Sequence, residues 1–306
     1  MRHSWIRLLA AAAVGILPAR LAAQDSMPDS AAMAAFEATL GYTSGQVTLG
    51  DSLATLQVPA EWRFIGPEGS RRLLEDAWGN PEGSADGVLG MLVPSAVSPL
   101  ADSGWAVVIT YDEDGYVNDE DAGSIDFAEL LEDMQESTEA ENKERVKEGY
   151  DRVTLVGWAE TPTYDSTSHK LYWAKELAFG GAPNHTLNYN VRVLGRRGVL
   201  VLNAVSGMPQ LAMVKQDMQT VIGFVNFNEG HRYTDFVEGK DKVAAYGIAG
   251  IVAGTLAAKA GFFKVILAGL LAAKKILIAG AVALFIWLRR LFTGRGAKRE
   301  EPKSAA

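Results

Sequence analysis

The chain has 306 residues, no cysteine and a formal net charge of −8. Without cysteine it can form neither a disulfide bond nor a lipid-modified N-terminal cysteine, and a closed zinc site is not expected. The acidic balance gives no basis for binding nucleic acid, and no cofactor-binding motif occurs in the sequence. We therefore expect neither a nucleic acid partner nor a cofactor.

Residues 1–23 have the features of a secretory signal peptide. A basic start with Arg2 and Arg7 is followed by a short apolar stretch, and the small residues Ala22 and Ala23 provide a cleavage site. An uncleaved N-terminal helix is the alternative, because Arg20 interrupts the end of the apolar stretch. Both interpretations export the residues that follow, and their number suits a single domain over residues 24–243, with a loose leader over 24–44.

The first half of this domain predicts strands with two short helices. Residues 45–59 alternate in polarity around Gly50-Asp51, which indicates a β-hairpin. Ser70 is expected to cap a helix over residues 71–78, and Asp126 to cap a helix within residues 124–149. The remaining expected elements are a helical turn near residues 31–40 and strands over residues 87–93 and 105–111.

The second half predicts a run of four strands and one helix. In residues 169–179, Leu171 and Trp173 fall on one side and Lys170 and Tyr172 on the other, and this strict alternation is typical of a strand. Strands that follow strands, with few helices between them, are typical of an α+β domain with a mainly antiparallel sheet. The expected strands are residues 151–160, 169–179, 186–194 and 198–206, and the helix runs from Pro209 to Ile222.

Residues 244–290 are predicted to form a membrane-anchoring helical region, followed by a basic cytoplasmic tail over 291–306. The region is long and apolar, but Lys264, Lys274 and Lys275 interrupt it and fall on one side of a helix. The main prediction is one transmembrane helix whose lysines reach the membrane interface or face a partner helix. The alternatives are a helical hairpin that uses residues 244–261 as its first span, and the same first span followed by a helix that lies in the interface.

Charge indicates the orientation. Residues 24–243 hold 16 basic and 35 acidic side chains, a net of −19, whereas the residues from Ala244 onward hold 10 and 2, a net of +8. Because basic segments stay in the cytoplasm, we expect the protein in the bacterial inner membrane, with its main domain in the periplasm or outside the cell.

An acidic loop is the first candidate site. Asp112, Asp114, Asn118 and Asp121 fall near the ligand positions of a calcium loop, but the first and last positions do not match its pattern. A simple turn at Asp114-Gly115 with solvated acids explains the same residues.

A second cluster contains Tyr164, Asp165, His169 and Lys170 and is a candidate groove for a partner, although aromatic strand residues are more often core. No catalytic triad is assigned. We expect a non-enzymatic binding or assembly module that joins an envelope protein or another copy of the chain. The alternative is an envelope hydrolase or transferase that uses acids of residues 112–121 with His169 as base, which requires His169 to lie near that loop at the rim of a pocket.

Three long segments resemble a bacterial family of uncharacterised membrane-anchored proteins, the domain-of-unknown-function 2167 family. They are residues 151–179, residues 187–207 and residues 233–254, and the acidic turn over residues 111–122 adds to the likeness. The resemblance implies membrane anchoring and supplies no catalytic residues. The order of strands and the last helix also suggest, as an alternative fold, a PsbP/Mog1-like α/β/α sandwich.

Overall fold

The structure is a computed structural model that describes residues 30–254, except 81, 102, 148 and 181. The signal peptide, the three membrane lysines and the basic tail expected from the sequence lie outside these residues. Within the described part, no helix is both long and apolar enough to cross a membrane.

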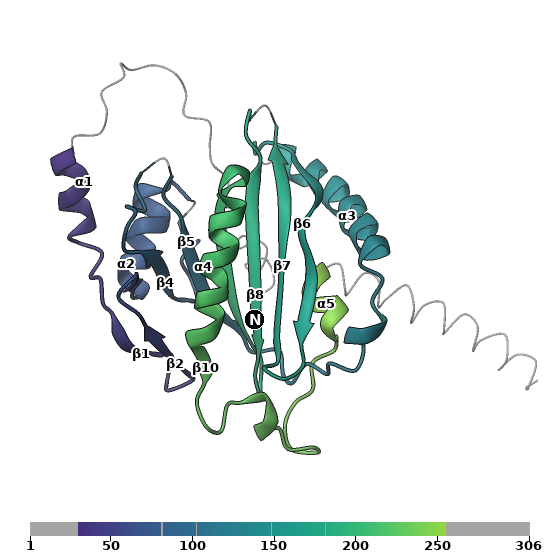
Figure 1. The fold of residues 1–306 in the computed structure, drawn as a ribbon. Coiled ribbons are helices and arrows are strands. Elements are labelled where there is room, and N and C mark those ends of the chain that lie inside the picture. Colours follow the sequence, from purple (N-terminus) through teal and green to yellow (C-terminus); the bar gives the residue numbers. More distant parts are fainter. Residues whose placement is uncertain (1–29, 81, 102, 148, 181, 255–306) are drawn as a thin grey trace, which may run out of the picture. The chain divides into compact units, whose positions relative to one another are not determined.

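The domain is built on a seven-stranded antiparallel sheet of order β3-β4-β5-β9-β8-β7-β6 (Figure 1). The mainly antiparallel α+β fold expected from the sequence is thus confirmed. The strands are β3 (Trp62–Ile65), β4 (Val88–Pro94), β5 (Ala106–Asp112), β6 (Val153–Asp165), β7 (Lys170–Phe179), β8 (Thr186–Leu194) and β9 (Val199–Gly207).

A smaller sheet of order β1-β2-β10 packs beside it. The hairpin predicted over residues 45–59 forms its β1 (Gly45–Leu49) and β2 (Ala54–Val58). Its third strand, β10 (Val225–Phe227), pairs with β2 across about 170 residues of chain and was not predicted. Neither was β3, because both strands are too short to show a pattern of their own.

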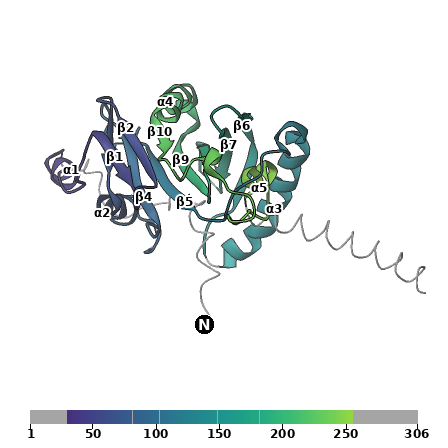
Figure 2. The ribbon, with the colours of Figure 1, turned by 90° about the horizontal axis from the view of Figure 1, so that it is seen from below.

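Helices cover both faces of the large sheet (Figures 1 and 2). Helix α4 and the small sheet pack on one face, and α2, α3 and α5 pack on the other. The helices are α1 (Ser30–Glu37), α2 (Pro67–Arg71, continued by a π-helical turn over Arg72–Ala77), α3 (Phe127–Lys147), α4 (Leu211–Phe224) and α5 (Ile248–Ala253), with 3-10 turns at Ala122–Ser124, Met208–Gln210 and Tyr233–Asp235.

This layering determines what covers the two sides of the strand predicted over residues 169–179. Lys170 is only 6% exposed, and Leu171 on the opposite face is fully buried. Both faces of β7 are covered here, so alternation in the sequence separates two buried layers rather than a core from solvent. The three layers match the architecture of the sandwich given as the alternative fold.

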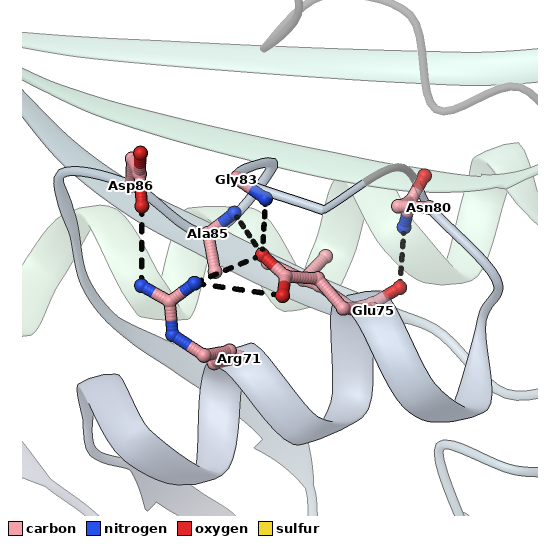
Figure 3. A network of polar contacts seen from close by, with 7 residues as sticks. Arg71, Glu75, Asn80, Gly83, Ala85 and Asp86 are labelled. Carbon is pink, nitrogen blue, oxygen red and sulfur yellow. Dashed lines mark hydrogen bonds and ion pairs between the residues drawn. The ribbon is translucent and has the colours of Figure 1, made fainter.

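The first helix on this face begins earlier than expected. Pro67 opens α2, and the side chain of Ser70 is buried and donates to the carbonyl of Ile65 at 3.3 Å, so Ser70 is not the predicted cap. The helix ends at Gly79 as predicted, in a left-handed conformation. Glu75 then holds the following loop by accepting hydrogen bonds from Arg71 and from the backbone of residues 83 and 85 (Figure 3).

Helix α3 secures the outer strand β6. Asp126 caps the helix as predicted, since its carboxylate accepts from the N–H groups of Ala128 and Glu129. Buried Asn142 exchanges two hydrogen bonds of 2.8 Å with the backbone of Val153, and Gln135 donates to two further carbonyls of β6. Three register shifts interrupt β6 where it pairs with β7. On the opposite edge, Thr43 exchanges backbone hydrogen bonds with Phe64 of β3.

The described domain continues beyond Val243, where the sequence placed its end. Residues 244–253 include α5, which packs against α3 and buries Ile248, Ile251 and Val252. The first residues of the apolar C-terminal region are therefore part of the folded domain, at least as far as Ala253.

Candidate functional site

The acidic loop, residues 112–121, follows β5 and binds the chain's own C-terminal segment. Asp114 accepts a hydrogen bond of 2.7 Å from the hydroxyl of Tyr246. The carboxylate of Asp121 accepts from the N–H groups of Ile248 and Ala249 at 2.9 and 3.0 Å, which satisfies donors at the start of α5. Both acids therefore have partners within the domain.

The weak calcium-loop candidate finds no support in this geometry. The side chain of Asn118 accepts a hydrogen bond from the backbone of Glu120 and closes a turn. Among the described residues, no three histidine, cysteine or acidic side chains are placed to hold a metal ion. The carboxyl of Asp112 is largely buried at the end of β5, and this burial raises its pKa.

Backbone contacts add to this attachment. Tyr116 donates to the carbonyl of Lys242, and Ala244 donates to the carbonyl of Tyr116, each at 2.8 Å. Gly115, which precedes Tyr116, has a φ of 112°, and a Cβ at this position would lie 2.7 Å from the carbonyl oxygen of Lys242. Only glycine fits so close an approach of two backbones.

An ion pair completes the attachment. Arg196, in the turn between β8 and β9, contacts Asp241 at 2.7 and 3.1 Å, and the Asp241 side chain is only 6% exposed. The hydrogen bond from Arg196 and a second from the backbone of Val237 lower the pKa of Asp241. We call these contacts of the acidic loop and Arg196 with residues 237–253 the clasp.

His169 lies next to the acidic loop. The hydroxyl of Tyr164 donates to Asp119 at 2.6 Å and is 3.2 Å from Nδ1 of His169, and Nδ1 is 3.8 Å from the Asp119 carboxylate. Burial and the hydrogen bond to Asp119 raise the pKa of Tyr164, so its phenol stays protonated. The imidazole stacks on the ring of Tyr233 with 4.2 Å between the ring centroids.

A cavity of about 340 Å³ opens beside His169. Lys170 lines it too and donates to the carbonyl of Ile222 at 2.7 Å, while burial lowers the pKa of its ammonium group. Asp165 does not line the cavity, because it closes a turn by accepting from Thr167 and Ser168. Of the four residues of the predicted groove, Tyr164 and His169 are in contact, Lys170 shares the cavity with His169, and Asp165 is separate.

The sequence indicated Asp119 only as one of the acids of residues 112–121, and it did not single out Arg196 or Tyr233. Each contacts a residue between 45 and 116 positions away along the chain, as in the hydrogen bond from Tyr233 to the carbonyl of Val117. Local patterns carry no signal for such contacts, and the sequence indicates residues 224–241 only as a lead into the membrane.

A family model described as "Protein of unknown function (DUF2167)" matches residues 41–285. No curated protein matches the sequence. The fold is similar to the solution structure of cyanobacterial PsbP (CyanoP) from Synechocystis sp. PCC 6803, with a TM-score of 0.35 and 9% identity over 60% of this chain and 91% of that one. It is also similar to LpqN, described as involved in cell envelope biogenesis of Mycobacterium tuberculosis, with a TM-score of 0.31 and 14% identity over 64% and 96%. Both TM-scores lie below 0.5, so neither likeness carries an argument about function.

Proposed function

The chain belongs to the family of proteins of unknown function designated DUF2167, and on that premise we propose that it is a non-enzymatic binding or assembly module of the bacterial envelope. In this proposal the domain lies outside the inner membrane, and residues after Gly254, up to about 290, anchor it there. Its partner is a second envelope protein or another copy of the chain, joined through the membrane region that carries Lys264, Lys274 and Lys275.

The clasp is the observation that carries this proposal. Acids that could serve catalysis, Asp114 and Asp121, are hydrogen-bonded to Tyr246 and to the start of α5. Their role is to hold the segment that leads into the apolar C-terminal region. A packed helix, rather than a loose linker, therefore precedes the predicted anchor, which suits a module whose position on the membrane must be fixed.

Single-cysteine labelling of the full-length chain tests the location, because the natural sequence has no cysteine to remove. Met213→Cys, at an exposed position of α4, reports on the domain, and Ala306→Cys reports on the tail. With the inner membrane intact, a membrane-impermeant maleimide should reach the first variant and not the second. Labelling of the tail under the same conditions would contradict the single crossing, and failure to label the first variant would contradict export.

One observation favours the second candidate, an envelope hydrolase or transferase. His169 lines the cavity, and its Nδ1 lies 3.2 Å from the hydroxyl of Tyr164, which in turn is hydrogen-bonded to Asp119, so a candidate general base stands beside the acidic loop. The test is a panel of hydrolase and transferase substrates with full-length protein, compared with His169→Asn and with His185→Asn as the control. Turnover that only the first substitution abolishes would establish the enzyme and refute the binding module. No turnover by the natural protein would leave the binding module as the better account.

A further inference from the structure

A row of polar side chains crosses the middle of the large sheet, on the face that carries α2, α3 and α5. Cross-strand partners point to the same face, so the register places Lys175 of β7 beside Asn188 of β8, and Asn190 of β8 beside Asn203 of β9. Arg192 lies on the same face, two residues beyond Asn190. We call these five residues the polar strip.

The polar strip runs between two apolar clusters. Trp173, the β7 partner of Asn190, belongs to the cluster formed with α3 and α5. Val108, the β5 partner of Asn203, packs against the cluster formed with α2. Figure 2 shows these helices at opposite ends of the sheet face. The strip therefore occupies the part of the face between them.

Within the polar strip, every side-chain acceptor receives a hydrogen bond, whereas several side-chain donors have no acceptor. Asn190 donates to the side-chain oxygen of Asn188 at 2.8 Å, and Arg192 donates to those of Asn203 and Asn190 at 3.0 and 3.5 Å. All three amide oxygens thus have a donor. In contrast, the amide nitrogens of Asn188 and Asn203 and the ammonium of Lys175 have no acceptor among the residues that the structure describes. The free groups of the strip are all donors.

The two cations of the strip also lack an ion-pair partner. No described carboxylate lies within 4.0 Å of Lys175 or Arg192, and the guanidinium of Arg192 sits 5.0 Å from the ring centroid of Trp173. Burial and the positive charge of Arg192 lower the pKa of Lys175 to about 8, and burial lowers that of Arg192 to about 10. Lys175 and Arg192 are only partly exposed, and the acids that act on them electrostatically, Glu141 and Asp112, form no ion pair with them, so an anion that reaches the two cations is favoured.

We propose that the polar strip binds an oxyanion, the carboxylate or phosphate group of a small organic ligand. The remaining N–H groups of Arg192 match the planar or bidentate geometry of such a group, and Lys175 adds a second charge. The amide nitrogens of Asn188 and Asn203 provide neutral donors for its other oxygens. This site uses none of the residues of the clasp, so the proposal of anion binding does not depend on the proposal that the chain is anchored to a membrane.

Calorimetric titration of the full-length chain in detergent tests the site, with citrate as the carboxylate probe and inorganic phosphate as the phosphate probe, at constant ionic strength and pH 7. Saturable binding of at least one probe is expected, and the probe that binds identifies the class of oxyanion. Lys175→Gln should weaken binding on the order of tenfold or more, because it removes a charge-assisted hydrogen bond. Lys147→Gln, on the exposed surface of α3, is the control and should bind like the natural protein.

Lys175 donates no hydrogen bond within the described domain, so its replacement leaves the packed network intact, and near-ultraviolet circular dichroism should be unchanged. A second variant, Arg192→Gln, should abolish binding. The proposal is overturned if the natural protein binds neither probe saturably, or if it binds no more tightly than Lys175→Gln.

Proton uptake gives an independent readout. Anion binding favours the charged form of Lys175 and raises its pKa, so binding of citrate between pH 8 and 9 should take up a proton, measurable in buffers of different ionisation enthalpy. The other charged or titratable groups near the strip are Glu141, Asp112 and Tyr246; burial raises the pKa of Asp112, and it raises that of Tyr246 further above this range. Lys175→Gln should show no uptake. Citrate binding by the natural protein without uptake, and with equal affinity at pH 7 and pH 9.5, would overturn the role of Lys175.

Discussion

Replacing Asp121 by alanine should release α5 from the domain. The substitution removes the carboxylate that accepts from the N–H groups of Ile248 and Ala249, at 2.9 and 3.0 Å. No side chain of α5 itself caps this end. The helix has only six residues, so its attachment depends on this cap and on the apolar contacts of its buried face.

The size of the effect follows from the two hydrogen bonds that the substitution removes. Replacing a capping side chain by alanine costs about 1 kcal/mol, and hydrogen bonds to a charged acceptor contribute about 1.5–3 kcal/mol. Because the two bonds share one carboxylate, we expect a combined loss of about 2 kcal/mol rather than the sum. That is about a 30-fold increase in the population in which α5 is detached.

Thiol labelling measures this population directly. Val252→Cys places a thiol at a position of α5 that is 2% exposed, so it reacts only when the helix opens. In full-length protein, Asp121→Ala should raise the labelling rate about 30-fold, whereas Glu120→Ala, which removes the same charge from an exposed neighbour, should not. Rates within threefold of each other in the two variants would refute the capping role of Asp121.

Three further substitutions test other parts of the fold by urea unfolding. Asn142→Ala should lower the free energy of unfolding by about 2–3 kcal/mol, because it leaves the buried N–H and carbonyl of Val153 without partners; a change under about 0.5 kcal/mol would contradict this. Gly90→Ala should cost about 2 kcal/mol or more, since φ is 154° and a Cβ would overlap a phenylalanine ring of β3, and an unchanged midpoint would refute it. Arg196→Gln should destabilise the domain at pH 7 and much less at pH 3. The pKa of Asp241 is lower in the folded state than in the unfolded state, so the ion pair stabilises the fold above the unfolded pKa of about 3.9. This stabilisation is lost as the pH falls through the folded-state pKa. An equal effect at both pH values would show that the charge of Asp241 is not involved.

The longer strands of the large sheet, all except β3, were predictable because each carries its own signal. Residues 186–194 are bounded as predicted, β7 differs from prediction by one residue at its start, and β9 is shifted by one residue at each end. Alternation locates a strand but does not report what covers each face, so it gave no indication that Lys170 is buried. The short β3 and β10 could not be predicted, since their stability comes from partners that are remote along the chain.

The candidate sites were harder to predict for the same reason. The sequence drew attention to the acids of the loop, but only the fold shows that Asp114 and Asp121 meet Tyr246 and α5. The polar strip did have a local signal, because Asn188, Asn190 and Arg192 occupy alternate positions in an otherwise apolar strand. Polar residues at every second position of a central strand indicate a buried polar surface, which apolar packing does not explain.

The hydrogen bonds made by both outer strands of the large sheet affect how copies of the domain behave at high concentration. A sheet edge with free backbone groups can recruit the same edge of a neighbouring molecule and start aggregation. In the described domain, β6 is interrupted by register shifts and bonded by Asn142 and Gln135, and β3 is paired with Thr43. The small sheet offers only strands of three to five residues, which are poor templates. Copies of the domain that meet at high concentration should therefore remain separately folded, and any assembly they form should leave each sheet intact.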